Sequence, residues 1–170
     1  MVHNNQVYAL TRGQASPTSE AGFFSKTTPE GAPMPVNPIA IAIASNASFI
    51  ARGFAGDVEH LAALIKQAVS HKGFSFLDIL QPCVSFNHIN TYDWFKKRVY
   101  KLDADKNYDP SNKLAAFEKA QEWDERIPLG IIYRKQRPTY EDSIIAIASP
   151  PLVKQSIEPG RIEKMMDGLL

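Results

Sequence analysis

Apolar residues fall along the chain in short runs and one-sided stripes that predict alternating strands and helices. Residues 48–54 and 74–80 are apolar runs of strand length, and we expect a buried strand at each. A helix capped by Asp57 and closed by Gly73 is predicted between them. Its apolar face consists of Leu61, Leu64, Ile65 and Val69. Strand, helix and strand in this order are typical of a βαβ unit, so the predicted fold class is α/β, with a mostly parallel sheet flanked by helices.

The segment before these strands combines a strand end with polar loops. Val7 and Tyr8 have the character of the end of a buried strand, and the polar residues after them supply hydroxyls, an amide, a cation and a glycine. Residues 20–36 predict an irregular loop that lies over a site, and Asn37 begins a short apolar helix through Ala44. Open α/β sheets place ligands at strand ends that open into polar loops, so we expect the site here.

The pattern changes after residue 87. We predict two helices, at about 92–102 and 112–123, followed by a strand at 129–133 and a loose tail. The last ten residues, 161–170, are compatible with a short amphipathic helix or with a frayed end. This part of the chain is predicted to be a C-terminal helical extension that wraps the core.

Composition and charge exclude several classes of function. At 170 residues the chain is long enough for one domain with a substantial core. Its 19 lysines and arginines balance 18 acidic residues, which gives no warrant for a nucleic-acid or membrane-surface partner. The longest apolar run, residues 39–44, is far shorter than the roughly 20 residues that span a bilayer. We therefore expect a cytoplasmic protein, and the single cysteine agrees with a reducing compartment.

One stretch is unlike ordinary core sequence. Residues 4–19 read NNQVYALTRGQASPTS. They resemble the second half of the thiamine-diphosphate motif in β subunits of 2-oxoacid:ferredoxin oxidoreductases, which reads as an Asn-rich pair, then Tyr-Gly-Leu-Thr-Lys-Gly-Gln, then Ser-Pro-Thr. Residues 73–87 (GFSFLDILQPCVSFN), 91–102 and 127–140 resemble the same subunit. Four matches in the same order argue against coincidence.

The resemblance implies a function for the chain. Such a β subunit, together with its α subunit, carries out the thiamine-dependent oxidative decarboxylation of a 2-oxoacid, here 2-oxoglutarate or pyruvate. Coenzyme A takes the acyl group, and electrons pass through a 4Fe-4S cluster to ferredoxin. The implied domains are residues 1–87, the C-terminal half of a thiamine-diphosphate-binding α/β domain, and residues 88–170, an extension packing on it.

A diphosphate is commonly held through Mg²⁺, which prefers oxygen ligands in near-octahedral geometry. Asn5 offers a side-chain oxygen and Val7 a backbone oxygen. In the family that the chain resembles, these two positions complete a magnesium site with an aspartate from an upstream Gly-Asp-Gly turn. The cofactor-binding set implied by the resemblance is Asn4, Asn5, Val7, Leu10, Thr11 and Gln14. On residue type alone, the pair Asn4–Asn5 would be interpreted as a turn.

Two residues of the motif have implied catalytic roles. Leu10 takes the position of the bulky apolar residue that holds the two cofactor rings in a bent conformation, although its residue type also fits plain core. Arg12 replaces the lysine usual in the family, and its guanidinium can grip the substrate carboxylate through two hydrogen bonds. Thr11, Gln14, Ser16 and Thr18 offer further donors to substrate or diphosphate oxygens, and Ser-Pro-Thr equally makes an ordinary turn.

Cys83 is the second candidate for chemistry. A lone cysteine after a strand is usually a small buried hydrophobic residue. The context QPCVSFN, residues 81–87, resembles the sequence around the fourth cluster cysteine of the family. Because iron–sulfur clusters of this type need four thiolates, a cluster ligated by Cys83 requires three cysteines that this chain does not contain.

The chain departs from the family pattern in one respect. The Gly-Asp-Gly turn belongs upstream of Asn4, where only three residues stand, and Gly56–Asp57 is no substitute because it lies downstream and caps a helix. We therefore expect the chain to correspond to the C-terminal half of such a subunit and to bind thiamine diphosphate weakly or not at all by itself. Two alternatives stay open: a thiamine-dependent decarboxylase or synthase without electron transfer, and a non-catalytic α/β scaffold that docks onto an α subunit.

Overall fold

The computed structural model describes residues 1–144, 150, 152–154, 156 and 159–168. The chain divides into two compact units, residues 1–137 and 138–170. The second unit contains the helix α5 (Tyr140–Ser143), the 3₁₀ helix η2 (Leu152–Lys154) and the helix α6 (Pro159–Asp167). Of the two alternatives for residues 161–170, the helix is confirmed as far as Asp167.

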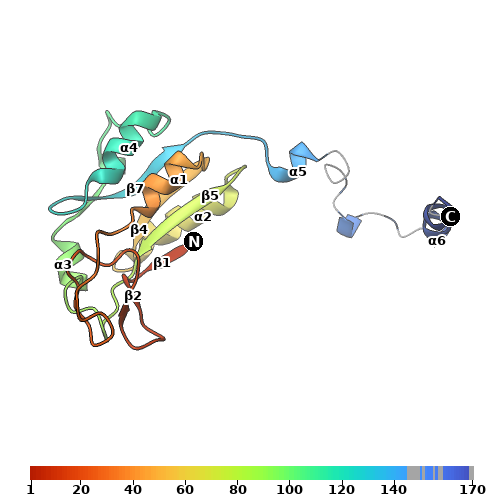
Figure 1. Ribbon diagram of the computed structural model, residues 1–170. Coiled ribbons are helices and arrows are strands. Elements are labelled where there is room, and N and C mark those ends of the chain that lie inside the picture. Colours follow the sequence, from red (N-terminus) through yellow and green to blue (C-terminus); the bar gives the residue numbers. More distant parts are fainter. Residues whose placement is uncertain (145–149, 151, 155, 157–158, 169–170) are drawn as a thin grey trace. The chain divides into compact units, whose positions relative to one another are not determined.

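A five-stranded mixed sheet forms the centre of the first unit (Figure 1). Its strands, in spatial order, are β1 (Val2–Asn4), β5 (Ser75–Leu80), β4 (Phe49–Phe54), β7 (Ile127–Arg134) and β6 (Val99–Lys101). The pairs β1–β5, β5–β4 and β6–β7 are parallel, whereas β4–β7 is antiparallel. The predicted α/β class with a mostly parallel sheet is confirmed.

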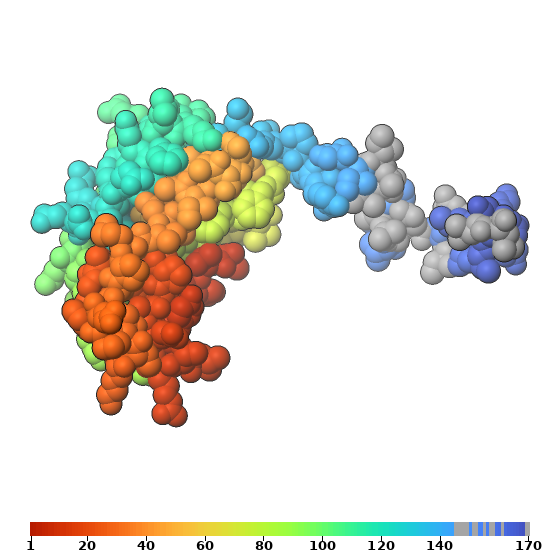
Figure 2. All heavy atoms as spheres, viewed as in Figure 1, coloured from red at the N-terminus to blue at the C-terminus, as the bar shows by residue number. Residues whose placement is uncertain are grey.

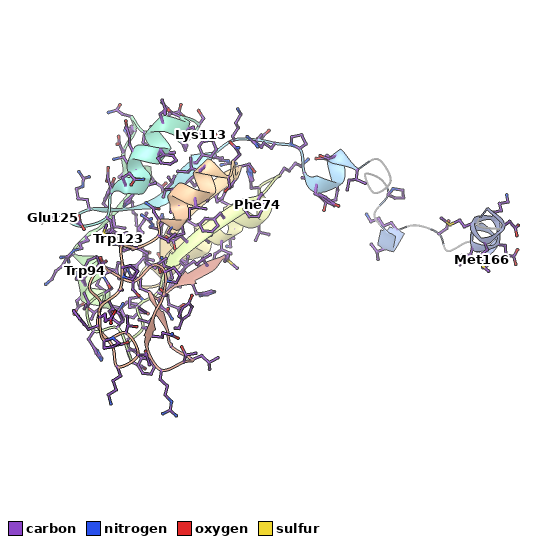
Figure 3. The ribbon with its side chains drawn as sticks, in the orientation of Figure 1. Phe74, Trp94, Lys113, Trp123, Glu125 and Met166 are labelled. Atoms are coloured by element: carbon purple, nitrogen blue, oxygen red, sulfur yellow. The ribbon has the colours of Figure 1, made fainter. Side chains whose placement is uncertain are left out.

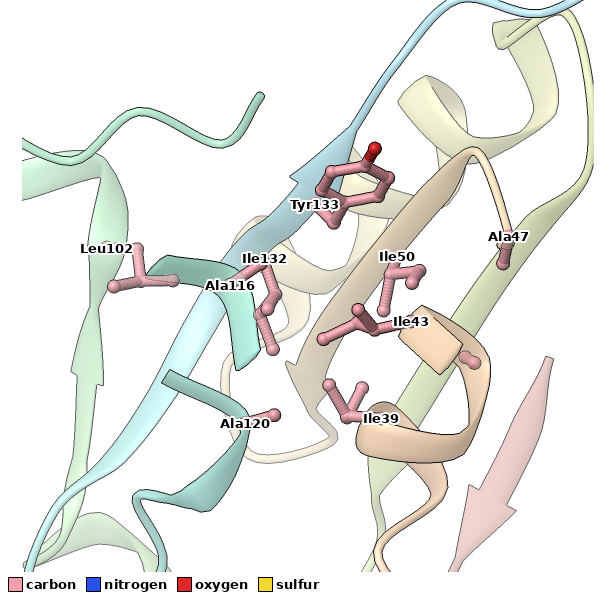
Figure 4. Close-up of a cluster of buried hydrophobic side chains, with 10 residues drawn as sticks. Ile39, Ile43, Ala47, Ile50, Leu102, Ala116, Ala120, Ile132 and Tyr133 are labelled. Carbon is pink, nitrogen blue, oxygen red and sulfur yellow. The ribbon is translucent and has the colours of Figure 1, made fainter. Parts of the chain in front are cut away.

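Helices cover both faces of the sheet. The helices α1 (Pro38–Ala44) and α4 (Lys113–Gln121) pack on one face through Ile39, Ile43, Ile50, Ala116 and Ile132 (Figure 4). The helix α2 (Val58–Ser70) packs on the other through Leu64, which belongs to one buried apolar cluster with Phe49, Ala51 and Leu77. Consecutive residues of β4 thus serve opposite faces, as the two-residue period of a strand requires.

The local signals for helix starts are confirmed. Asn37 caps α1 by accepting from the amide of Ala40, and Asp57 caps α2 by accepting from the amide of His60. The predicted apolar face of α2 is wrong at Val69, which is 78% exposed, because Ala68 rather than Val69 packs on the apolar cluster in the last turn. The helix ends at Ser70 rather than at Gly73, and Gly73 adopts φ +120° in the turn that follows.

The helix predicted at 92–102 is wrong in its second half. The helix α3 covers only Tyr92–Lys96, capped by Thr91, and Val99–Lys101 form the edge strand β6. Pairing of β6 with Ile127–Leu129 outweighs the local helical pattern because it satisfies the backbone polar groups of both segments. The extension after residue 87 therefore supplies two strands of the main sheet. The domain boundary at residue 87 stays a prediction.

A small second sheet follows β1. The strands β2 (Val7–Tyr8) and β3 (Gln14–Ala15) pair antiparallel as a hairpin. Val7 and Tyr8 are therefore not the end of the main-sheet strand, which stops at Asn4. Figure 2 shows the first residues of the chain, in red to orange, gathered at one end of the first unit.

Candidate functional site

A strained turn follows the carboxyl end of β1. The side-chain oxygen of Asn5 accepts from the amide of Val7 at 3.1 Å, and Gln6 between them adopts φ +60°, which non-glycine residues rarely do. Gln6 is held in this conformation on both sides. Its side chain donates to the carbonyl of Thr18 at 3.0 Å, and its carbonyl accepts from the hydroxyl of Ser19. Strain that the surroundings hold in place is characteristic of functional sites.

The buried Asn4 ties this turn to the loop that follows β3. The hydroxyl of Thr18 donates to Asn4 Oδ1 at 2.7 Å, and the Ser16 hydroxyl lies 3.0 Å from that of Thr18. The amide side chain of Asn4 thus has a structural partner within the chain.

The β2–β3 hairpin carries the rest of the first motif at its tip. Leu10 is 99% exposed and Arg12 is exposed, with φ +70°. The hydroxyl of Thr11 bonds the carbonyl of Tyr8 at 3.1 Å and Gln14 Oε1 at 3.3 Å. The hairpin therefore presents the side chains of Leu10 and Arg12 outward, away from the rest of the first unit.

The loop that carries Cys83 lies directly beside the first motif. It leaves β5 next to the end of β1, where the amide of Gln81 donates to the carbonyl of Asn4 at 3.1 Å. Cys83 is half-buried against a small cluster formed by Val7, Phe23 and Ala32. The two motifs, far apart in sequence, therefore share one edge of the sheet.

Gly13 provides a second contact between the motifs. A Cβ at position 13 would lie 2.8 Å from Phe86 Cδ1, and the residue adopts φ +92°. Both the close approach and the positive φ require glycine.

A buried ion pair lies on the face of the sheet behind this edge. Arg52 of β4 and Asp78 of β5 are register partners, and Arg52 Nε donates to Asp78 Oδ2 at 3.1 Å. Their side chains are only 2% and 0% exposed. Within the described residues, Arg52 Nη1 and Asp78 Oδ1 have no hydrogen-bond partner. The Arg52 guanidinium also lies over the ring of Trp123, 5.3 Å from its centroid.

A cavity of about 330 Å³ opens above this pair. Asn4, Thr18 and Glu20 line it on the side of the first motif. Met34, Pro35 and Val36 contribute an apolar wall, so the loop 20–36 does lie over this part of the sheet.

Away from this edge, around α4, lie three polar side chains that hydrogen-bond to one another and have shifted pKa values: Tyr100, Lys119 and Glu122. Burial alone would raise the pKa of Glu122, but hydrogen bonds from Lys119 and Tyr100 outweigh burial and hold that pKa below its usual value. The Glu122 hydrogen bond raises the pKa of Lys119. Burial, the largest cause, raises the pKa of Tyr100.

Comparison with known proteins identifies the family of the chain. Residues 1–79 match the family model "Thiamine pyrophosphate enzyme, C-terminal TPP binding domain", and residues 83–149 match the model of the C-terminal region of the pyruvate ferredoxin oxidoreductase beta subunit. A β subunit of a 2-oxoacid:ferredoxin oxidoreductase from Sulfolobus is 44% identical over all of this chain and 61% of its own length. One from Aeropyrum pernix is 42% identical over 91% of this chain and 54% of its own length. The chain belongs to this β-subunit family.

A solved structure agrees with this assignment. A 2-oxoglutarate:ferredoxin oxidoreductase from Magnetococcus marinus, with 2-oxoglutarate, coenzyme A and succinyl-CoA bound, superimposes with a TM-score of 0.79 at 32% identity. The match covers 96% of this chain and 56% of that chain. The chain thus spans between half and two thirds of the length of the β-subunit relatives named above.

The structure brings together only part of the set expected for a β subunit of this family. Asn4 at the end of β1 and Asn5 and Val7 just after it lie close to the Cys83 loop, whereas Leu10 and Arg12 point outward from the hairpin tip. The roles assigned to these residues, and to Thr11 and Gln14, stay predictions. Sequence reasoning missed three polar residues of this region: Glu20, Arg52 and Asp78. A charged residue inside an apolar strand run, present in both β4 and β5, was the available signal for the buried pair.

Among the described residues, no group of three or more His, Cys, Asp and Glu side chains is placed to hold a metal ion. None of the helices in the described part of this protein is long and apolar enough to cross a membrane.

Proposed function

We propose that this chain is the C-terminal part of the thiamine-diphosphate-binding β subunit of a 2-oxoacid:ferredoxin oxidoreductase. The complete enzyme would convert a 2-oxoacid, either 2-oxoglutarate or pyruvate, and coenzyme A to acyl-CoA and carbon dioxide, with electrons passing to ferredoxin. The observation that carries this proposal is the Asn5–Val7 turn at the carboxyl end of β1, next to the loop of Cys83. The ligands named for the Magnetococcus structure support 2-oxoglutarate as the first substrate to test.

The turn suits a magnesium diphosphate. Asn5 Oδ1 accepts a hydrogen bond from one backbone amide and keeps a second lone pair for a metal ion. The carbonyl of Val7 lies two residues further on. An amide oxygen and a backbone carbonyl are ligands that Mg²⁺ accepts, while phosphate and carboxylate oxygens complete its shell. In the family motif the carboxylate ligand belongs to an upstream Gly-Asp-Gly turn, so in this proposal it comes from another part of the protein.

The exposed hairpin tip suits the organic part of the cofactor and the substrate. In this proposal Leu10 contacts the bound cofactor and fixes its conformation, which accounts for a leucine that nothing in this unit covers. Arg12 holds the carboxylate of the 2-oxoacid through its guanidinium. Thr11 and Gln14 donate to cofactor or substrate oxygens. Thiamine diphosphate itself, when bound, supplies the electron sink for decarboxylation.

Cys83 would supply one of the four thiolates of a 4Fe-4S cluster. Since the chain contains a single cysteine, the other three ligands belong to the remainder of the subunit. An α subunit and ferredoxin are the proposed protein partners, with no nucleic-acid or membrane partner, and a cytoplasmic location stays a prediction.

Titration of thiamine diphosphate with Mg²⁺ by calorimetry tests the proposal. The isolated chain is compared with the chain mixed with the N-terminal part of the Sulfolobus relative. We expect saturable binding only in the mixture, lost in Asn5→Ala and kept in Asn107→Ala, since Asn107 is exposed and far along the sequence from the motif. Saturable binding by the isolated chain would contradict a divided site. Absence of binding in both samples would contradict the proposed function.

A further inference from the structure

Three segments that are distant in sequence meet on one oxygen of Glu20. Its Oε1 accepts from Asn90 Nδ2 at 3.1 Å and from Trp123 Nε1 at 2.7 Å. The partners lie 70 and 103 positions further along the chain. Trp123 stands beside Trp94, with 6.4 Å between their ring centroids (Figure 3). Two hydrogen bonds from separate segments end on this one oxygen, so Glu20 is the junction that connects the loops.

On one side, the junction continues into the cofactor turn. The two residues before Glu20 are the ones that hold the turn: Thr18 bonds Asn4, and Ser19 donates to the carbonyl of Gln6. A displacement of Glu20 therefore displaces the groups that keep Gln6 in its strained conformation.

On the other side, the junction continues into the loop of Cys83. Asn90 Oδ1 accepts from Asn87 Nδ2 at 3.2 Å, and the amide of Asn87 donates to the carbonyl of Cys83 at 3.0 Å. Asn87 and Asn90 are buried although both are amides. Buried amides at the end of a loop need partners, and Glu20 supplies one from outside the loop.

We propose that Glu20 is a positioning residue that holds the Cys83 loop in a fixed place relative to the Asn5–Val7 turn. Its consequence for electron transfer rests on the proposed function, in which these two segments bind the cluster and the cofactor. The coupling between the segments does not rest on that function, because it consists of contacts within this chain.

The coupling depends on the position of the acceptor oxygen of residue 20 rather than on its charge. Both bonds end on the same Oε1 atom, and a glutamine keeps an acceptor oxygen at that position. An aspartate keeps the charge but withdraws the oxygen by one methylene. The coupling therefore survives Glu20→Gln and is lost in Glu20→Asp and Glu20→Ala.

Cys83 provides a reporter of the loop because it is the single cysteine of the chain. The experiment measures the rate at which a small thiol reagent labels Cys83 in the full chain under native conditions, without any cofactor. We expect Glu20→Ala and Glu20→Asp to raise the rate about tenfold, as the loss of two hydrogen bonds predicts, and Glu20→Gln to stay near wild type. Glu30→Ala is the matched control, since Glu30 is an exposed glutamate of the same loop.

A double-mutant cycle that combines Glu20→Ala with Asn90→Ala tests whether the coupling passes through Asn90. We expect Asn90→Ala alone to raise labelling, and the double variant to label no faster than the faster single variant, because both remove one connection. Trp123→Phe keeps an aromatic ring but removes the indole N–H donor, and should give only part of the increase.

Three results would overturn the proposal. The first is unchanged labelling in Glu20→Asp and Asn90→Ala, two variants that keep most of the local packing. The second is faster labelling in Glu20→Gln equal to that in Glu20→Ala. The third is a full effect in Trp123→Phe with none in Asn90→Ala. Since no arm uses thiamine diphosphate, failure here is separate from failure of the proposed function.

Discussion

The core around α1 and the loops at the carboxyl ends of β1 and β5 are held in place by different interactions. Ile39, Ile43 and Ile50 are fully buried between helix and sheet. The loops have a much smaller apolar cluster, and instead depend on directional contacts of buried amides, hydroxyls and one carboxylate. Of the three described non-glycine residues with positive φ, two, Gln6 and Arg12, also lie in these loops. The comparison indicates that the fold rests on apolar packing, while the site geometry rests on few long-range polar contacts.

The buried ion pair gives the largest expected effect, since it is a polar contact inside the well-packed sheet. Replacing Asp78 with Asn leaves the charge of Arg52 buried and uncompensated, and we expect a loss of about 3–5 kcal/mol in the free energy of unfolding by urea titration. Asp93→Asn is the control, because Asp93 is an exposed member of a surface pair. A loss no larger than in the control would show that the pair does not support the sheet.

Apolar packing is tested on a single helix. Ile43 is 0% exposed and Ile41 is 54% exposed, although both belong to α1. Ile43→Ala is expected to cost about 2–5 kcal/mol of unfolding free energy, through lost apolar contacts and a residual cavity. Ile41→Ala should cost a small fraction of that. Equal losses at the two positions would mean that α1 does not stabilise the sheet through its buried face.

The loops are tested at Gly13. An alanine there meets both a positive φ and Phe86, so Gly13→Ala is expected to destabilise by about 1–3 kcal/mol. Gly22→Ala separates the two causes, because Gly22 has φ +77° with open space around its Cβ direction. Denaturant titration of both variants should show the larger loss at Gly13. A larger loss at Gly22 would argue against close packing between the two motifs.

The smallest expected effect is the pH dependence of stability that Glu122, next to α4, contributes. The folded pKa of Glu122 lies below its usual value of 4.5. Its contribution to stability is therefore complete above that value and is lost as the pH falls through the folded pKa. Because the group is half-exposed, the loss should stay below about 1 kcal/mol. The free energy of unfolding, measured by denaturant titration at pH 7 and at acid pH, should fall as the pH falls, and the fall should be smaller in Glu122→Gln. An equal fall in both proteins would show that Glu122 does not cause it.

Local features of the sequence were sufficient for much of the fold. The helix start at Asn37 and the cap at Asp57 were predicted and are confirmed, since a helix start depends on hydrogen bonds within three residues. The strand β6 was missed because its formation depends on pairing with β7, nearly thirty positions away. Val69 was misplaced because helical periodicity leaves the edge of the apolar face open, and packing against the sheet selects Ala68 instead.

Motif order and residue types determined the family of this chain and the fold class, because both depend on patterns that are read along the sequence. Only the tertiary structure decided that the turn at Asn5 and the loop of Cys83 lie side by side, and that Glu20 joins them. It also decided that Arg52 and Asp78 form a buried pair. These contacts join residues between 26 and 103 positions apart, and hydrogen bonds of that range depend on how strands align in the sheet rather than on any local preference.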